Sequence, residues 1–282
     1  MILFKKTTAL KQFLLNAKQE RKTIGFVPTM GALHKGHLSL ISKAADENDI
    51  TVASIFVNPA QFNDPKDFEK YPVTIENDIR LLAVSGCHAL FLPSTPEIYP
   101  NGYAQLQHFP LGDIENSFEG KFRPGHFQGV CNVMQRLLDI VQPNRLYMGQ
   151  KDYQQCMVVN KLIGLMNSTT QLITCPTLRE PDGLAMSSRN LRLDDNSKAN
   201  ATALSKALLY IKENIQTGSL DKILQHATEI LLQKEFTIDY IAIADAATLA
   251  PVHHWDGKQQ LVALAAAFQK DVRLIDNMLL NQ

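Results

Sequence analysis

The sequence predicts an α/β protein whose first part is a parallel sheet with helices on both faces. The first observation is an alternation, up to about residue 175, of short apolar runs typical of strands with segments of helical periodicity. The second is a change of order after Asn190, where two helical segments precede three consecutive strand-like runs. Helices followed by strands indicate a smaller α+β domain. We therefore expect a first domain over residues 1–177 and a second over residues 178–282.

The predicted elements of the first part begin with a helix capped by Thr8. A strand over residues 23–27 ends at Pro28, where the backbone loses a hydrogen-bond donor. Residues 50–57 are almost continuously apolar, which indicates a strand buried on both faces. The other predicted elements of this part are a helix around residues 38–45, helix 74–84, strand 89–92, helix 129–141, strand 145–148, helix 152–166 and strand 171–175.

The second part is expected to begin with helices over residues 196–216 and 220–234. Strands are expected over residues 237–244, 260–267 and 271–276. Between the elements of the first part, the stretch from 93 to 129 is long, rich in glycine and proline, and weakly periodic. Long ordered loops in compact domains are more often functional than idle, so we expect this stretch to serve the site.

Charge and composition exclude several classes of protein. The chain has 282 residues, is 45% hydrophobic, and balances 28 Lys and Arg against 28 Asp and Glu. A broad nucleic-acid or membrane-surface footprint needs a basic excess, so we expect neither partner. The longest purely apolar run, Leu261 to Phe268, is far too short to span a membrane, and the N-terminus lacks the apolar stretch of a secretory signal.

Four isolated cysteines point to a reducing compartment. They stand at wide spacings, without a CxxC pair, among apolar or helix-forming residues: Cys87, Cys131, Cys156 and Cys175. This pattern is typical of buried, reduced thiols, so we expect a cytoplasmic protein.

The segment from Pro28 to His37 is the first candidate site. It lies between a strand and the start of a helix, where α/β proteins bind phosphates at free backbone N–H groups. Gly31 and Gly36 have the glycine spacing of a P-loop, but His37 and Leu38 follow instead of Lys and Ser or Thr, which excludes that mechanism. What remains is a pair of imidazoles three residues apart, hence on one helix face, where they can donate hydrogen bonds to a phosphate.

Two other interpretations of His34 and His37 stay open at this point. A His-x-x-His pair could bind a metal, although no third ligand lies nearby in the sequence. The histidines could also be surface or capping residues of the helix.

Two later segments carry further phosphate-binding chemistry. Lys151 stands at the start of a predicted helix, where its ammonium can face a phosphate, although Lys-Asp at such a position is usually only capping and solvation. Met186 to Arg189 supplies two hydroxyls and a guanidinium that suit triphosphate oxygens. An ordinary polar loop with an N-cap serine is the alternative.

These segments together resemble a known family. His34-Lys35-Gly36-His37 matches the HxGH signature of the nucleotidylyltransferase and class I aminoacyl-tRNA synthetase superfamily, and residues 28–40 resemble the pantothenate synthetase (pantoate–β-alanine ligase) family. Residues 186–189 are similar to the KMSKS signature, with Ala185 in place of its first lysine. Three further family-like strings lie at residues 58–63, 123–129 and 149–155, which makes five motifs in the expected order.

The resemblance implies a Rossmann-like nucleotide- and pantoate-binding domain over residues 1–177 and an α+β domain over residues 178–282 that covers the active site. It implies an ATP-dependent ligase that condenses (R)-pantoate with β-alanine through a pantoyl adenylate, releasing pyrophosphate and AMP. The catalytic residues would be His34, His37, Lys151 and Arg189. The residues that would contact ATP are Met30, Gly31, Ala32, Leu33, His34, Lys35, Gly36, His37, Gly149, Gln150, Lys151, Asp152, Leu178, Met186, Ser187, Ser188 and Arg189.

Gln61, Gln155 and Met30 would bind pantoate or β-alanine, since neutral amides hold hydroxyls and carboxylates without acting as nucleophiles. Arg123 and His126 would close over the site without being catalytic. ATP chemistry implies Mg²⁺, with Asp78 as a weak candidate ligand whose simpler explanation is a solvated charge on a helix. The resemblance also implies a homodimer.

Three alternative functions stay in view. An adenylyltransferase acting on a phosphate ester would usually be smaller and lack residues 178–282. A tRNA synthetase would need an anticodon-binding domain and a basic surface. A silent nucleotide-binding protein would bind ATP without turning over any acid.

Overall fold

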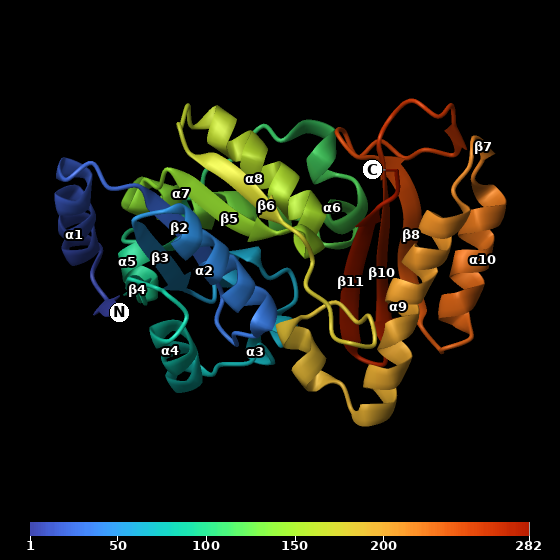
Figure 1. Ribbon diagram of the computed structural model, residues 1–282, viewed down its shortest axis with the longest axis horizontal. Helices are drawn as coiled ribbons and strands as arrows, with labels where there is room; N and C mark the ends of the chain where they lie inside the picture. The colour runs from blue at the N-terminus through green and yellow to red at the C-terminus, as the bar shows by residue number, and fades with distance from the viewer. Residues whose placement is uncertain (282) are drawn as a thin grey trace. The chain divides into compact units, whose positions relative to one another are not determined.

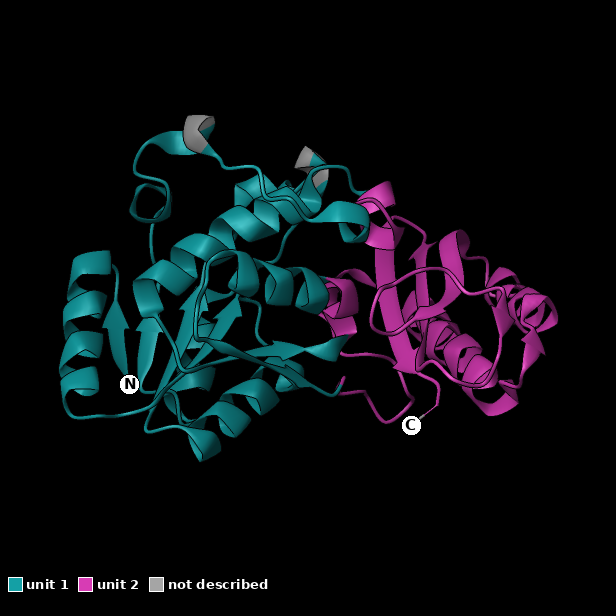
Figure 2. Cartoon of the chain, turned by 90° about the horizontal axis from the view of Figure 1, so that it is seen from above, with its two compact units in different colours: residues 1–115, 123–150, 155–176 teal, residues 116–122, 151–154, 177–282 magenta. Residues whose placement is uncertain are grey.

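The computed structural model describes the backbone of residues 1–281 and the side chains of that range except at positions 65, 66, 104 and 105. The chain divides into two compact units, shown in Figure 2. The first comprises residues 1–115, 123–150 and 155–176, and the second comprises residues 116–122, 151–154 and 177–282. The expected division into folding domains at residues 177 and 178 stays a prediction.

The first unit is built on a six-stranded parallel sheet with the strand order β1-β4-β3-β2-β5-β6 (Figure 1). Its strands are β1 (Ile2–Phe4), β2 (Ile24–Thr29), β3 (Ile50–Ile55), β4 (Ala89–Phe91), β5 (Arg145–Gly149) and β6 (Gln171–Cys175). From β2 the chain winds outward through β3 and β4, and it then returns to add β5 and β6 on the other side of β2. The reversal lies between β2 and β5, and at such a switch point doubly wound sheets bind their ligands.

Helices cover both faces of this sheet, as the sequence predicted (Figure 1). They are α1 (Thr7–Gln19), α2 (Lys35–Glu47), α4 (Ile75–Ala83), α7 (His126–Val141) and α8 (Tyr153–Leu165). Phe26 of β2 packs in the cluster that includes α1, α7 and α8, whereas its neighbour Val27 packs with α2 and α4. Both side chains are fully buried. Burying side chains of this size contributes about 1.5–3 kcal/mol each, which explains why this strand is apolar at every position from 24 to 27 except Gly25.

Several elements differ from the sequence prediction, most of them by a few residues at an end. Strand β1, which was not predicted, pairs Ile2–Phe4 with β4 at the edge of the sheet. Helix α1 begins at Thr7, whose N–H donates to the Glu97 carboxylate at 2.8 Å, so the expected cap at Thr8 is wrong. Strand β2 continues through Pro28 to Thr29, because beyond Phe26 it pairs only with β3 and Pro28 needs no donor on the β5 side.

The long stretch after β4 contains short helices and is held by side chains of α7. The short elements of this stretch are α5 (Thr95–Ile98), η2 (Gly102–Gln105) and η3 (Gly112–Glu115). Two other short elements, η1 (Pro59–Gln61) and α3 (Pro65–Glu69), lie earlier, between β3 and α4. The Gln128 amide bonds both backbone groups of Phe109 at 2.9 Å, and Asn132 does the same for Gln107 at 2.9 Å. These amides satisfy the loop backbone as a neighbouring strand would, so the stretch is ordered.

The second unit holds a three-stranded antiparallel sheet in the order β11-β10-β8 (Figure 1). Its elements are α6 (Phe118–Phe122), η5 (Ser188–Arg192), α9 (Asp195–Asn214), β7 (Gly218–Ser219), α10 (Asp221–Leu232), β8 (Thr237–Asp245), β9 (His254–Trp255), β10 (Leu261–Gln269) and β11 (Val272–Leu279). Helices α9 and α10 pack on one face of this sheet through Leu208, Ala227 and their neighbours. The α+β prediction for the C-terminal part is confirmed. Within the described range, no helix is both long and apolar enough to cross a membrane.

Candidate active site

The loop between β2 and α2 turns sharply at two residues in the left-handed region. Gly31 has φ 82° and Ala32 has φ 49°, a conformation that costs a residue with a Cβ about 1–2 kcal/mol. The Thr29 hydroxyl accepts a hydrogen bond from the Gly31 N–H at 3.1 Å. Both carboxylate oxygens of Asp78 accept from the loop, one from Ala32 N–H at 2.9 Å and the other from Leu33 N–H at 2.8 Å. The buried carboxylate of Asp78 therefore anchors the turn.

The two histidines cap helix α2 reciprocally. The His34 Nδ1 accepts from the Gly36 N–H at 3.2 Å, and the His37 Nδ1 accepts from the His34 N–H at 3.3 Å. The ring centroids lie 4.0 Å apart. An imidazole nitrogen that accepts a backbone N–H carries no proton, so in each neutral ring the proton resides on Nε2. Both rings thus present an Nε2–H donor, and the capping interpretation and the phosphate-binding interpretation are compatible.

This geometry corrects the expectation that free backbone N–H groups of the loop bind phosphate. The N–H groups of Gly31, His34, Gly36 and His37 donate within the loop and the first helical turn, and those of Ala32 and Leu33 donate to Asp78 of α4. These backbone groups are therefore already paired within the protein.

Asp78 is not a solvated helix residue, as its simpler explanation assumed. It is fully buried, and besides the two backbone donors it accepts the Thr74 hydroxyl at 3.0 Å. Its lone pairs are directed at the loop, so we withdraw it as a candidate Mg²⁺ ligand. Within the described residues, no group of three or more His, Cys, Asp or Glu side chains could hold a metal ion.

Gln61 lies on the 3₁₀ turn after β3 and contacts Met30, with its Nε2 2.7 Å from the Met30 Sδ. This brings together two of the three residues predicted to bind pantoate or β-alanine. The His126 Nδ1 lies 2.8 Å from the Gln61 carbonyl oxygen, and the Arg123 guanidinium lies 3.1 Å from the His126 Nε2. The carbonyl requires a donor, so His126 carries its proton on Nδ1.

The start of α7 is shaped to receive this turn. A Cβ at Gly129 would lie 2.1 Å from the Ala60 carbonyl oxygen, so only glycine permits the approach. Buried Asn58 donates to the Gly129 carbonyl at 3.1 Å and accepts the Tyr99 hydroxyl at 3.0 Å. The motif over residues 123–129 therefore positions the turn that carries Gln61, a role the sequence did not reveal.

The second unit contains a pocket that gathers the later candidates. The predicted residues Lys151, Ser187 and Arg189 line it, although they come from segments far apart in the sequence. The other lining residues are Leu184, Ala185, Asn190, Leu204, Arg273, Leu274, Ile275 and Asp276. The Lys151 side chain is largely buried, and its Nζ lies 3.8 Å from the Asp152 carboxylate.

The segment from Ser187 to Arg189 begins a 3₁₀ turn. The Ser187 hydroxyl accepts the Arg189 N–H at 3.3 Å, so the N-cap interpretation of this serine is confirmed. The Asn190 amide donates to the Ala185 carbonyl at 3.0 Å, which fixes the chain on the other side of Ser187. Ser188 is buried.

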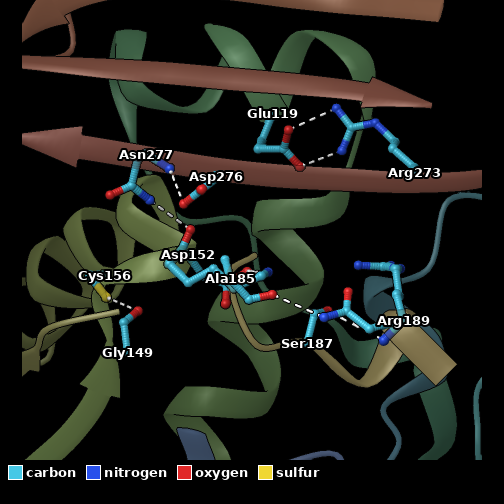
Figure 3. A network of polar contacts seen from close by, with 12 residues as sticks. Glu119, Gly149, Asp152, Cys156, Ala185, Ser187, Arg189, Arg273, Asp276 and Asn277 are labelled. Atoms are coloured by element: carbon cyan, nitrogen blue, oxygen red, sulfur yellow. Dashed lines mark hydrogen bonds and ion pairs between the residues drawn. The ribbon is translucent and has the colours of Figure 1, made fainter. Parts of the chain in front are cut away.

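Arg273, which also lines the pocket, is fully engaged by acids of the same unit (Figure 3). It makes a bidentate pair with Glu119, both contacts at 2.7 Å, and its Nε contacts Asp239 at 2.7 Å. Burial lowers the pKa of Arg273, but the hydrogen bonds and charge of Glu119 outweigh it and hold that pKa above its usual range. Sequence reasoning missed Arg273 and Glu119, because neither belongs to a recognisable string.

The other predicted ligand contacts differ in exposure. Gln155 is half-buried on α8, Leu178 is 40% exposed, and Met186 is buried. Lys35 is exposed, and the Gly149 carbonyl accepts the Cys156 thiol at 3.4 Å. All four cysteines are buried and none forms a disulfide, as predicted.

Comparison with known proteins identifies the family. The family model described as pantoate-beta-alanine ligase matches residues 2–279. A pantothenate synthetase from Porphyromonas gingivalis is 42% identical over 279 residues, covering 99% of both chains, and one from Fervidobacterium nodosum is 44% identical over 285 residues, covering 100% of both.

Solved structures agree. Pantothenate synthetase from Thermus thermophilus matches with a TM-score of 0.91 at 40% identity, covering 100% of each chain. Pantoate-beta-alanine ligase from Francisella tularensis, complexed with beta-gamma ATP and beta-alanine, matches with a TM-score of 0.83 at 37% identity over 99% of this chain and 97% of its own. Sequence and fold thus agree from end to end, and the chain belongs to the pantoate–β-alanine ligase family.

Proposed function

We propose that this chain condenses pantoate with β-alanine at the expense of ATP. In the first half-reaction a pantoate carboxylate oxygen attacks the α-phosphorus, the bond to the β-phosphate oxygen breaks, and pyrophosphate leaves. In the second, the β-alanine amine attacks the acyl carbon of pantoyl adenylate, loses a proton, and expels AMP. The product is an amide, so the enzyme is a ligase that forms a carbon–nitrogen bond.

The observation that carries this proposal is the pair of backbone hydrogen bonds accepted by the two histidines, from which the tautomer of each neutral ring follows. Each Nδ1 accepts a backbone N–H, which leaves an Nε2–H donor on His34 and on His37. Attack on the α-phosphorus places charge on phosphoryl oxygens, and fixed donors aimed at developing charge are the largest catalytic contribution in such reactions. We assign His34 and His37 to those oxygens, with His37 as the main donor in the transition state.

Charge neutralisation in the second unit follows the same logic. We assign Lys151, Ser187, Ser188 and Arg189 to the remaining phosphate oxygens, since an ammonium, hydroxyls and a guanidinium are suitable donors. Three of these residues line one pocket. Arg273 is not assigned to phosphate, because its guanidinium is occupied by Glu119 and Asp239.

The polar contacts of the acid substrate are assigned to Gln61 and Gln155, with Met30 as an apolar contact. Gln61 is supported by its position beside Met30 and by the His126 bond to its carbonyl. In this assignment Arg123 and His126 position Gln61 and do not take part in the chemistry.

Mg²⁺ is proposed to enter with the nucleotide. The described residues offer no cluster of three or more metal-ligating side chains, and Mg²⁺ is commonly held by substrate phosphates, waters and one or two protein oxygens. Its chemistry would be charge neutralisation on the phosphates. The family resemblance further suggests a homodimer, which light scattering would test, and four reduced thiols suit the cytoplasm.

The test follows pyrophosphate and AMP separately when the protein is incubated with ATP, Mg²⁺ and D-pantoate. Without β-alanine we expect pyrophosphate near the enzyme concentration, and with β-alanine sustained AMP and pantothenate. Absence of pantoate-dependent pyrophosphate would refute the proposal. Turnover of a phosphate ester instead would indicate an adenylyltransferase, and ATP binding without turnover a silent nucleotide-binding protein.

A further inference from the structure

Two neighbouring residues of the last strand, Asp276 and Asn277 of β11, make contacts that the strand itself does not require (Figure 3). Both are almost fully buried, at 3% and 2% exposure. The Asp276 carboxylate also accepts the Asn277 N–H at 2.8 Å, which links the two residues. Buried polar side chains are costly unless they are bonded, so their partners indicate their purpose.

Asn277 holds the backbone of Lys151. Its Nδ2 donates to the Lys151 carbonyl at 2.8 Å across 126 residues of sequence. Lys151 stands in a short 3₁₀ turn, Gln150–Asp152, which joins the end of β5 to the start of α8. The Asn277 bond adds a long-range anchor at the carbonyl of the residue that carries the ammonium group.

Asp276 holds the segment that leads into Ser187. Its carboxylate pairs with Arg179 through contacts of 2.6 and 3.0 Å, and the same guanidinium donates to the Gly183 carbonyl at 3.1 Å. Residues 179 and 185 face each other in an isolated antiparallel bridge, and the Met186 N–H donates to the Leu178 carbonyl at 3.0 Å. Arg179 thus fastens a small hairpin whose second arm continues into Ser187–Arg189.

Strand β11 is a rigid base for both contacts. Asp276 pairs with Ala265 and Asn277 with Leu264 of β10, within a ladder that runs from Val262 to Gln269. Asp276 itself lines the pocket with Lys151 and Arg189, and its pairing with Arg179 prevents it from acting as an uncompensated anion there. A carboxylate without a partner in that pocket would repel phosphate.

We propose that Asp276 and Asn277 are positioning residues for nucleotide binding. Through them a single strand, β11, fixes the position of the Lys151 turn relative to the Ser187–Arg189 turn. This inference rests on the proposed function, because it assigns phosphate binding to Lys151 and Arg189. Neither residue touches the nucleotide in this account. Each acts through the segment that it fastens.

The test is a double-mutant cycle on pantoate-dependent pyrophosphate release. We expect Asn277→Ala to lower kcat/KM for ATP by about 10- to 100-fold, the loss typical of a displaced contact group. In a Lys151→Met background the same change should cost less than about twofold, because residues that act through one another are not additive. Asp276→Asn should behave in the same way against Arg189→Met.

Asn281→Ala is the matched control. Its amide makes the same kind of bond, donating to the Gln259 carbonyl at 2.9 Å, near the end of the same chain but outside the pocket lining. We expect it to reduce thermal stability about as much as Asn277→Ala while leaving kcat/KM within about twofold. If Asn277→Ala does not fold, Asn277→Leu keeps the side-chain volume, removes the donor without adding a charge and should show the same loss.

Two results would overturn the inference. One is unchanged kcat/KM in both Asn277 variants of an active enzyme. The other is an equal loss with and without the Lys151→Met substitution, which would mean that Asn277 acts independently of Lys151. Failure of the proposed function is distinct, because wild-type protein would then release no pyrophosphate with pantoate.

Discussion

The loop over residues 28–37 and the pocket around Lys151 are held together in different ways. The loop is fixed largely by itself: Thr29, His34 and His37 bond backbone groups within a few residues, and Asp78 adds a distant anchor. The pocket depends on partners far along the chain. Lys151 is held by Asn277 across 126 residues, and Arg179 by Asp276 across 97.

This difference decides how each region responds to substitution. A locally held loop concentrates structure and chemistry in the same side chains, so a change to one affects capping and catalysis together. In the pocket these tasks are divided between residues that contact the ligand in our proposal and residues that only position them. Predictions that separate the two tasks therefore test the comparison.

The largest expected effect comes from His37→Glu. Glutamate at the third helical position completes a capping box by accepting the His34 N–H, so stability should stay within about 0.5 kcal/mol. The substitution removes the Nε2–H donor, and the new negative charge repels phosphate. Adenylate formation should therefore slow at least about 100-fold, which corresponds to roughly 3 kcal/mol of activation free energy. Pre-steady-state pyrophosphate release and thermal melting measure the two quantities.

His37→Gln serves as the control for this change, because it keeps the cap and also offers an N–H donor. It should retain more activity than His37→Glu at similar stability. An unchanged first half-reaction in the glutamate variant would refute the role of His37 and leave only its capping function.

Asp78→Asn is expected to have the next largest effect. The new amide group would oppose one of the two loop N–H donors, and losing a buried bond to a charged acceptor costs about 2–3 kcal/mol. Asp49→Asn is the matched control, since Asp49 also accepts a backbone N–H, from Thr23 at 2.8 Å, but at an exposed position. Urea denaturation should show a clearly smaller loss for Asp49→Asn, and equal losses would show that the loop does not depend on its buried anchor.

The same contrast explains what the sequence could predict. The strand–helix alternation and the string around His34 and His37 are local, so periodicity and the family resemblance found the sheet, its covering helices and the loop. The role of Asp78 was missed because a helical acid gives no sign of which backbone it will meet. Asp276, Asn277 and Arg273 were missed for the same reason: their partners Arg179, Lys151 and Glu119 are distant in the sequence and become neighbours only in the folded unit.

Ser187→Ala should have a smaller effect on stability, about 1 kcal/mol, because it removes the cap of a short turn that is also fixed by Asn190. Ser187→Gly should cost only a few tenths of a kcal/mol as a cap while removing the same hydroxyl. If Ser187 binds phosphate, both variants should raise KM for ATP equally despite their different stabilities. A KM that follows stability would instead make Ser187 a structural cap alone.

Ala32→Gly should have the smallest effect. It tests whether the turn keeps its conformation without the restricted backbone of Ala32. Glycine removes the strain at φ 49° but increases the entropy of the unfolded chain and loses a buried methyl group, so the net change should be a few tenths of a kcal/mol. Arg21→Gly is the control, at φ 58° and exposed, where the strain is relieved without loss of burial and stability should rise. Because Asp78 still binds the Ala32 and Leu33 N–H groups, activity in Ala32→Gly should stay within about twofold. A tenfold loss would mean that the turn is set by the restricted backbone of Ala32 rather than by the carboxylate beneath it.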